Sequence, residues 1–134
     1  MDAQKSKQVV LDFFQSMNEG EFEKSGQFFA EDATMWVVGS TPFSGTMYGR
    51  QEILEKNFLP SKEFTVPGSA SVELGDVIAE GDKVAAEWIF RRKMTSGKDY
   101  ENYFFGLFSV KNGKIQTFRE YLDTHYAQKM LWGD

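Results

Sequence analysis

The spacing of apolar residues changes at about Phe64, from a mainly helical period to the alternation of strands, and this order restricts the fold most strongly. Before Phe64 the pattern predicts a helix with apolar positions over 9–17, a short helix over 21–29, a strand over 34–38 and a helix from Gly49 to Pro60. After Phe64 it predicts strands over 71–79, 83–94, 100–110 and 114–122, then a short helix or arm over 124–134. Helices followed by an antiparallel meander predict an α+β fold, with helices packed on one face of a curved sheet.

Length and composition exclude several classes of protein. A chain of 134 residues predicts one domain, over 1–134, with a buried core. The formal net charge of −5 argues against a nucleic-acid partner. The chain has no cysteine and a single histidine, His125, so we expect no disulfide, no thiol catalysis and no metal site. Neither a membrane-spanning segment nor a signal peptide is evident, so we expect a cytoplasmic protein with no membrane partner.

Three segments carry a family pattern: Phe28-Phe29-Ala30-Glu31-Asp32-Ala33-Thr34, Gly45 through Tyr48-Gly49-Arg50, and Asn112-Gly113-Lys114-Ile115 running on to Arg119-Glu120-Tyr121-Leu122-Asp123. In this order they resemble the SnoaL-like branch of the nuclear transport factor 2-like superfamily, which includes polyketide cyclases, ketosteroid isomerase and limonene epoxide hydrolase. The resemblance implies a cone-shaped sheet wrapped around the N-terminal helices (a cystatin-like α+β roll) with a deep apolar pocket. It does not imply one activity, because this superfamily hosts many functions.

The resemblance also implies a set of pocket residues. Glu120 falls on the position of one acid of the epoxide hydrolase relay, whereas the other relay positions fall near Glu87 and Ile89. Since the Tyr and Asn positions of those enzymes fall on Trp36 and Val38, and the acids of ketosteroid isomerase are also missing, neither known mechanism is expected here. The residues implied to line the pocket and bind substrate are Phe14, Met17, Trp36, Val38, Ile89, Arg91, Phe104, Phe118 and Leu122.

Glu120 is the main candidate for chemistry. Strand alternation places it on one face with Phe118 and Leu122, and the resemblance makes this face the concave one. A carboxyl group beside Phe118 in an apolar cone should have a raised pKa, because burial disfavours the charged form, and it could then act as a general acid or base. The alternative is that Glu120 pairs with an Arg or lies at the wet rim.

Two further candidates, Glu87 and Asn102, depend on which face of a strand points inward. Composition alone points Trp88 and its apolar neighbours inward and leaves Glu87 in solvent, whereas the resemblance implies the reverse. The Asn102 amide could orient a ligand carbonyl or a water, although a hydrogen-bonded core Asn explains it equally well. His125 could approach the pocket mouth, but a surface position is the simpler interpretation.

Together these features predict a cofactor-free enzyme that isomerises, cyclises or hydrates a hydrophobic, cyclic, carbonyl-bearing small molecule. Glu120 would transfer the proton, and Glu87 or Asn102 would orient water or stabilise an oxyanion. The alternatives are a binding module for an apolar metabolite and a dimerisation module of the same fold. We also expect a homodimer through the convex sheet face, with Trp88, Phe90 and Tyr103 as anchors.

Overall fold

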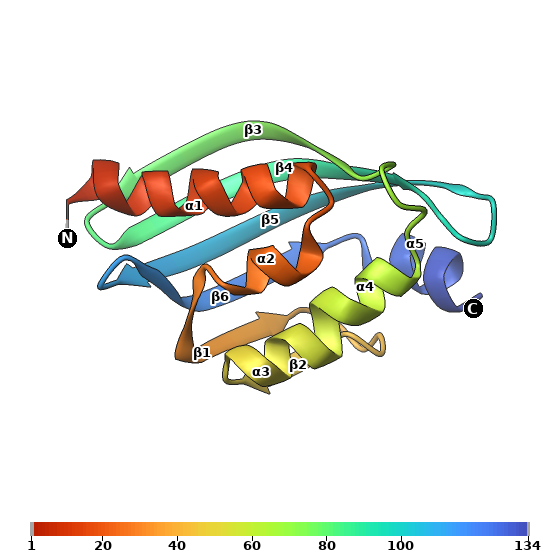
Figure 1. Ribbon diagram of the computed structural model, residues 1–134, viewed down its shortest axis with the longest axis horizontal. Helices are drawn as coiled ribbons and strands as arrows, with labels where there is room; N and C mark the ends of the chain where they lie inside the picture. Colours follow the sequence, from red (N-terminus) through yellow and green to blue (C-terminus); the bar gives the residue numbers. More distant parts are fainter. Residues whose placement is uncertain (1, 134) are drawn as a thin grey trace.

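The structure is a computed structural model that describes residues 2–133 (Figure 1). Within that range, six strands form one sheet in the order β2-β1-β6-β5-β4-β3. The strands are β1 (Phe29–Val37), β2 (Gly45–Tyr48), β3 (Ser71–Glu80), β4 (Lys83–Lys93), β5 (Asp99–Lys111) and β6 (Lys114–Leu122). The four predicted strands after Phe64 are therefore present, and each lies within two residues of its expected bounds.

The helices begin and end close to the expected positions. The first helix, α1 (Ala3–Asn18), is capped by the Asp2 side chain, which accepts a hydrogen bond of 2.8 Å from the Lys5 N–H. It ends before Gly20, whose φ of 72° is the left-handed conformation that favours glycine after a helix. The remaining helical segments are α2 (Phe22–Gly26), α3 (Arg50–Ile53), η1 (Leu54–Phe58), α4 (Leu59–Glu63), α5 (Thr124–Ala127) and η2 (Gln128–Trp132).

Two helix boundaries differ from the prediction. The helix expected over 21–29 stops at Gly26, because Phe29 already pairs with Ile115 in the sheet. The helix expected to stop at Pro60 instead continues to Glu63. Directly before Pro60, η1 is a π-helical turn, which is wider than an α-helical turn. We attribute the tolerance of Pro60 to this widened turn, because a proline inside a regular α-helix clashes with the preceding turn.

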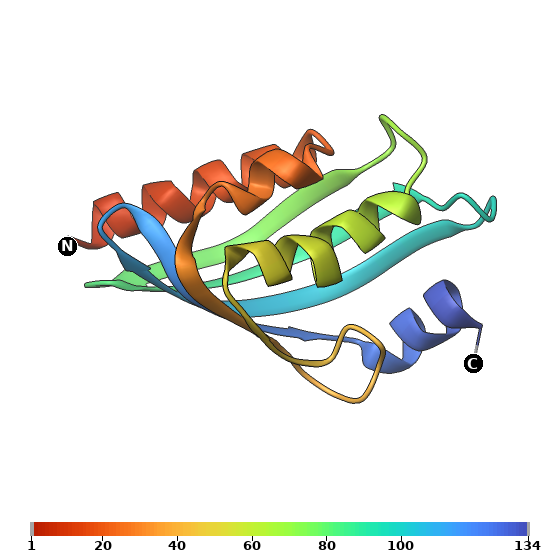
Figure 2. The same ribbon diagram turned by 60° about the horizontal axis from the view of Figure 1, so that its bottom comes forward.

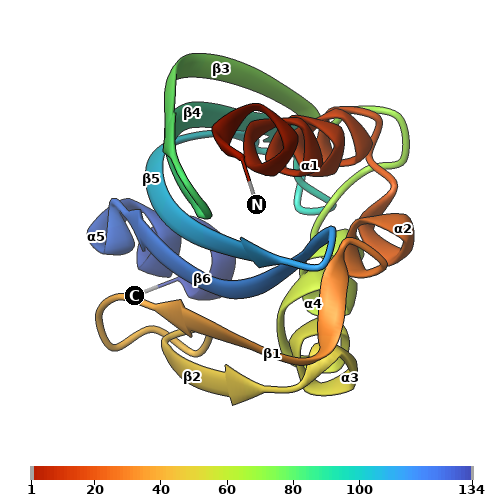
Figure 3. The same cartoon turned by 90° about the vertical axis from the view of Figure 1, so that its left-hand side faces the viewer.

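The sheet is strongly curved, and α1 and the segment from α3 to α4 lie on its concave side (Figures 2 and 3). Strands β3 to β6 form the expected antiparallel meander, whose last hairpin turns at Asn112-Gly113 with φ of 52° and 76°. The one parallel pair joins β1 to β6, so the sheet is mixed. The fold is α+β, as expected, and the curved sheet wraps around the helices as a cone (Figure 3).

Inward-facing side chains of the sheet pack against α1 and the segment from α3 to α4 to form the core. On β4, the even-numbered residues from Val84 to Arg92 are all buried, and the odd-numbered residues are partly or fully exposed. The rings of Phe108 and Phe118 stack with centroids 4.2 Å apart on the same concave side. This register decides which polar groups reach the interior of the cone.

Candidate functional site

A narrow cavity lies between the concave face of the sheet and the helices. The space between the atoms is about 700 Å³ when the opening to solvent is included. The volume of the cavity itself is only about 60 Å³. The wall is mainly apolar, and its polar side chains are Thr41, Asn57, Ser61, Arg92, Tyr100 and Glu120. Because an apolar pocket with a few polar groups is typical of small-molecule sites, this cavity is the candidate site.

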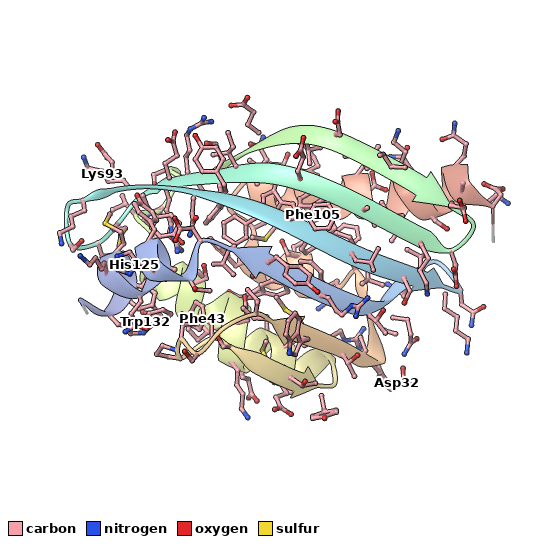
Figure 4. All side chains as sticks on the ribbon, turned by 180° about the vertical axis from the view of Figure 1, so that it is seen from behind. Asp32, Phe43, Lys93, Phe105, His125 and Trp132 are labelled. Atoms are coloured by element: carbon pink, nitrogen blue, oxygen red, sulfur yellow. The ribbon has the colours of Figure 1, made fainter. Side chains whose placement is uncertain are left out.

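Aromatic rings from distant parts of the chain enclose one end of the cavity. The Phe43 ring lies 4.9 Å from the Trp132 ring and 6.4 Å from the Phe64 ring, and both Phe43 and Trp132 line the cavity. Figure 4 shows Phe43 and Trp132 at the same end of the molecule as α5. The loop that carries Phe43 approaches Thr124 so closely that a Cβ at Gly39 would lie 2.8 Å from its methyl group. Glycine at position 39 therefore permits this closure.

Strand β6 places Glu120 in the cavity wall, opposite Gly106 of β5. The rings of Phe118 and Trp88 pack over Gly106 so tightly that a Cβ there would lie 2.7 and 2.9 Å from them. Glu120 is half-buried, because it faces the cavity, yet this apolar surrounding raises the pKa of its carboxyl group to about 8. Desolvation is the cause, and neither a hydrogen bond nor a nearby cation offsets it within residues 2–133. Glu120 is therefore mainly protonated at neutral pH.

Arg92 is a second ionisable group in the cavity wall, and it is 5% exposed. Its Nη1 donates to the carbonyl and the hydroxyl of Ser61, at 3.0 and 2.8 Å, and to the Thr65 hydroxyl at 3.0 Å. The guanidinium group lies 5.0 Å from the Phe90 ring centroid and 4.5 Å from that of Tyr100. Burial lowers the pKa of Arg92, although Tyr100 opposes this effect.

The Tyr100 hydroxyl is held in place by Asn102. The Asn102 amide donates to the Tyr100 oxygen at 2.9 Å and to the Asp123 carbonyl at 3.1 Å, and its own carbonyl accepts from the Tyr103 N–H at 2.8 Å. Asn102 is 1% exposed and does not line the cavity. Burial is the largest influence on Tyr100 and raises the pKa of its hydroxyl. Asn102 is therefore a positioning residue for Tyr100, and its buried side chain does not reach the cavity.

Asn57 is a polar group in the cavity that the sequence analysis did not identify. It lies in the π-helical turn η1, is 8% exposed and lines the cavity. π-Helical turns often occur at functional sites, because they shift one side chain out of the regular helical pattern. Nothing in the spacing of 49–60 distinguishes such a turn from a regular helix, so no sequence signal pointed to Asn57.

Four of the expected lining residues, Phe14, Met17, Phe104 and Leu122, do line the cavity with Glu120. The rings of Phe14 and Phe104 lie against the two sides of Trp88, with centroid distances of 4.7 and 5.3 Å. Phe118 points to the concave side but is 1% exposed and lies in the core beside the cavity. The structure therefore brings Phe14 and Met17 of α1 together with Phe104 of β5 and with Glu120 and Leu122 of β6.

The residues expected on β4 lie on the opposite face, and this part of the expectation is wrong. The Glu87 side chain is exposed on the convex face, where it lies over Gly75 and accepts a hydrogen bond of 3.3 Å from the Asp76 N–H. On the same face, Arg91 forms ion pairs of 2.8 Å with Glu73 and 2.6 Å with Glu101. Ile89 has the same parity and also lies outside the cavity. A shift of one residue reverses every side chain of a strand, and the resemblance misplaced β4 in this way.

Trp36 and Val38 also lie outside the cavity. Met35 and Val37 are the buried residues at the end of β1, so Trp36 faces outward and packs 5.3 Å from the Tyr121 ring. Conversely, Trp88 and Phe90, expected at a dimer interface, line the cavity and are 7% and 5% exposed. The composition of β4, with its apolar even-numbered positions, had indicated this orientation correctly.

The last candidate of the sequence analysis, His125, lies away from the cavity. His125 is exposed at the start of α5 and does not line the cavity (Figure 4). Among residues 2–133, no three His, Asp or Glu side chains are grouped closely enough to hold a metal ion. In the same part of the chain, no helix combines the length and the apolar character needed to span a bilayer.

Comparisons with known proteins identify the family. The family model described as a SnoaL-like domain matches residues 10–118. Among solved structures, an NTF2-like protein of Burkholderia thailandensis E264 is similar with a TM-score of 0.80 and 20% identity over 98% of both chains. A protein of Jannaschia sp. CCS1, assigned as a SnoaL-like polyketide cyclase, has a TM-score of 0.77 and 14% identity over 98% of this chain and 94% of that one. An LEH-like epoxide hydrolase of M. tuberculosis has a TM-score of 0.74 and 19% identity over 96% and 90%. The chain belongs to the SnoaL-like domain family.

Proposed function

We propose that the chain is a cofactor-free acid–base catalyst that isomerises, cyclises or hydrates a hydrophobic, carbonyl-bearing cyclic compound. The observation that carries the proposal is the Glu120 carboxyl group, which lines an apolar cavity and has no ion-pair or hydrogen-bond partner among residues 2–133. A carboxyl group with a pKa of about 8 is a stronger base than an ordinary glutamate when it is ionised. Near neutral pH both of its protonation states are accessible, which suits proton transfer in either direction.

The polar groups around Glu120 suggest how the reaction would proceed. Ionised Glu120 would remove a proton from the carbon next to the substrate carbonyl, and the electron pair would move to the carbonyl oxygen. Tyr100, oriented by Asn102, and Asn57 both line the cavity and could donate hydrogen bonds to that oxygen. Protonated Glu120 would then return the proton at a second position, which completes an isomerisation without any co-reactant.

Hydrogen–deuterium exchange into 2-tetralone, an apolar cyclic ketone, tests this proposal. We expect the protein to accelerate exchange next to the carbonyl and Glu120→Gln to lower the protein-catalysed rate at least about 100-fold, the usual contribution of a general base. Because the base must be ionised, the rate should rise with pH and level off above about 8, with Arg92 and Tyr100 as the other ionisable groups in the cavity. NMR in D₂O measures the exchange.

Glu87→Gln is the matched control, because it removes a carboxylate from the exposed convex face of β4, which β5 separates from β6. It should leave exchange unchanged. Wild-type rates in Glu120→Gln would contradict the catalytic role of Glu120. Binding of the ketone without any exchange by the wild-type protein would favour the binding module instead.

We retain the homodimer as a proposal with different anchors. Tyr103, Phe105 and Tyr121 lie on the convex face and are 61%, 46% and 38% exposed, and Figure 4 labels Phe105 on this face. Trp88 and Phe90 no longer belong to this set. Exposed aromatic side chains on one face support an association surface.

A further inference from the structure

Arg92 is a buried cation without an anionic partner. Among residues 2–133, no carboxylate lies within ion-pair distance of it. Its Nη1 donates to oxygens of Ser61 and Thr65, and the Tyr100 hydroxyl also interacts with the guanidinium group, so every oxygen around it is uncharged. The Nε–H is buried with no acceptor. Buried charges are normally paired, and buried donors without an acceptor are rare.

The neighbouring Arg91 shows what the same side chain does when a partner is available. Arg91 lies on the convex face, donates from two different nitrogens to Glu73 and Glu101, and so has two carboxylates around it. Arg92 has two aromatic rings around it instead, those of Phe90 and Tyr100. Interactions with ring faces stabilise a guanidinium group only partly, and they leave its edge free for hydrogen bonds.

Three ionisable side chains lie on the cavity wall and determine its charge: Glu120, Arg92 and Tyr100. Glu120 is mainly uncharged at neutral pH, and it does not form an ion pair with Arg92. Because burial also raises the pKa of Tyr100, that side chain is uncharged in the same range. The cavity therefore has one positive charge, contributed by Arg92, inside a mainly apolar wall.

We propose that Arg92 binds an anionic group of the ligand, so that the cavity binds an apolar organic carboxylate more tightly than the matching neutral compound. A carboxylate matches the planar edge of a guanidinium group, and it would supply the anionic partner that Arg92 lacks. The apolar body of the ligand would lie against Phe14, Trp88 and Phe104. The inference rests on the cavity of the proposed function, but Arg92 determines which ligand binds and Glu120 determines whether it reacts.

Matched pairs of small aromatic acids and amides test the proposal: benzoate with benzamide, phenylacetate with phenylacetamide, and trans-cinnamate with trans-cinnamamide. Affinities are measured at pH 6.5, where Glu120 is protonated, by quenching of tryptophan fluorescence. We expect at least one acid to bind about tenfold or more tightly than its amide, the usual effect of a charge-assisted hydrogen bond. This preference should disappear in Arg92→Met and persist in Arg91→Met, the matched control on the convex face.

A second measurement uses only the wild-type protein, so it does not require the Arg92→Met variant to fold. In ¹⁵N-labelled protein, the Nε–H signal of Arg92 should shift on addition of the acid and not of the amide, while those of Arg50, Arg91 and Arg119 stay in place. Equal affinity for acids and amides, failure of all three pairs to bind, or a preference that persists in Arg92→Met would overturn the proposal. Glu120→Gln should keep the preference for the acid, so loss of exchange chemistry and loss of anion binding are separable results.

Discussion

Replacing Glu120 by glutamine is expected to raise the free energy of unfolding at pH 8 by about 3–4 kcal/mol. The upper value follows from a pKa of about 8 in the folded protein against 4.5 for an ordinary glutamate, since one pKa unit corresponds to 1.36 kcal/mol and Glu120 is already half ionised in the folded protein at pH 8. The lower value allows for water in the cavity, because Glu120 is only half-buried. Glutamine keeps the shape and polarity of the side chain but removes the ionisation.

The difference in stability between the wild type and Glu120→Gln should depend on pH. Below about pH 4.5, Glu120 is protonated in both the folded and the unfolded chain, so wild type and Glu120→Gln should be about equally stable. Between about pH 4.5 and 8 the unfolded chain ionises first, so the wild type should lose stability relative to the variant as the pH rises. Urea unfolding at a series of pH values measures the difference, with Glu87→Gln as the control. A constant difference across this range would show that Glu120 is not desolvated.

Replacing Trp88 by alanine is expected to lower the free energy of unfolding by about 3–5 kcal/mol. The side chain is 7% exposed, and its ring stacks on Phe104 and packs against Phe14 in the cavity wall. Tyr103→Ala on the convex face, where the side chain is 61% exposed, should change the stability of the monomer by less than about 1 kcal/mol.

Denaturant unfolding at a low protein concentration, where association does not contribute, compares the two variants. If Tyr103→Ala were the more destabilising change, β4 and β5 would present the opposite faces to the cone. The assignment of Glu87 and Arg91 to the convex face would then be wrong as well.

The fold could be predicted from the sequence because several local signals agree. The helical spacing from Val9 to Met17, the left-handed Gly20 and the Asn112-Gly113 turn each indicate one local structure, and all are present. The parallel pairing of β1 with β6 could not be predicted from local pattern, because it joins segments about 80 residues apart. The π-helical turn before Pro60 could not be predicted for a different reason, because its sequence has the same apolar spacing as a regular helix.

The candidate site could be predicted only in part. Glu120, Phe104 and Leu122 lie on strands whose inner face the sequence analysis assigned correctly. On β4 both faces include apolar residues, and the choice made from the resemblance reversed them. Had Trp88 been placed inward on composition, Arg92 would have followed four positions later on the same face, as the buried cation of the cavity.

Titration of the Glu120 carboxyl carbon by ¹³C NMR tests the central claim most directly, with the exposed Glu87 carboxyl as an internal reference. An apparent pKa near 8 for Glu120 is the predicted result, and it would establish a protonated acid in the cavity at neutral pH. A value at or below the ordinary range, about 4.3 for a free glutamate, would contradict the account, because Glu120 would then be hydrated or ion-paired.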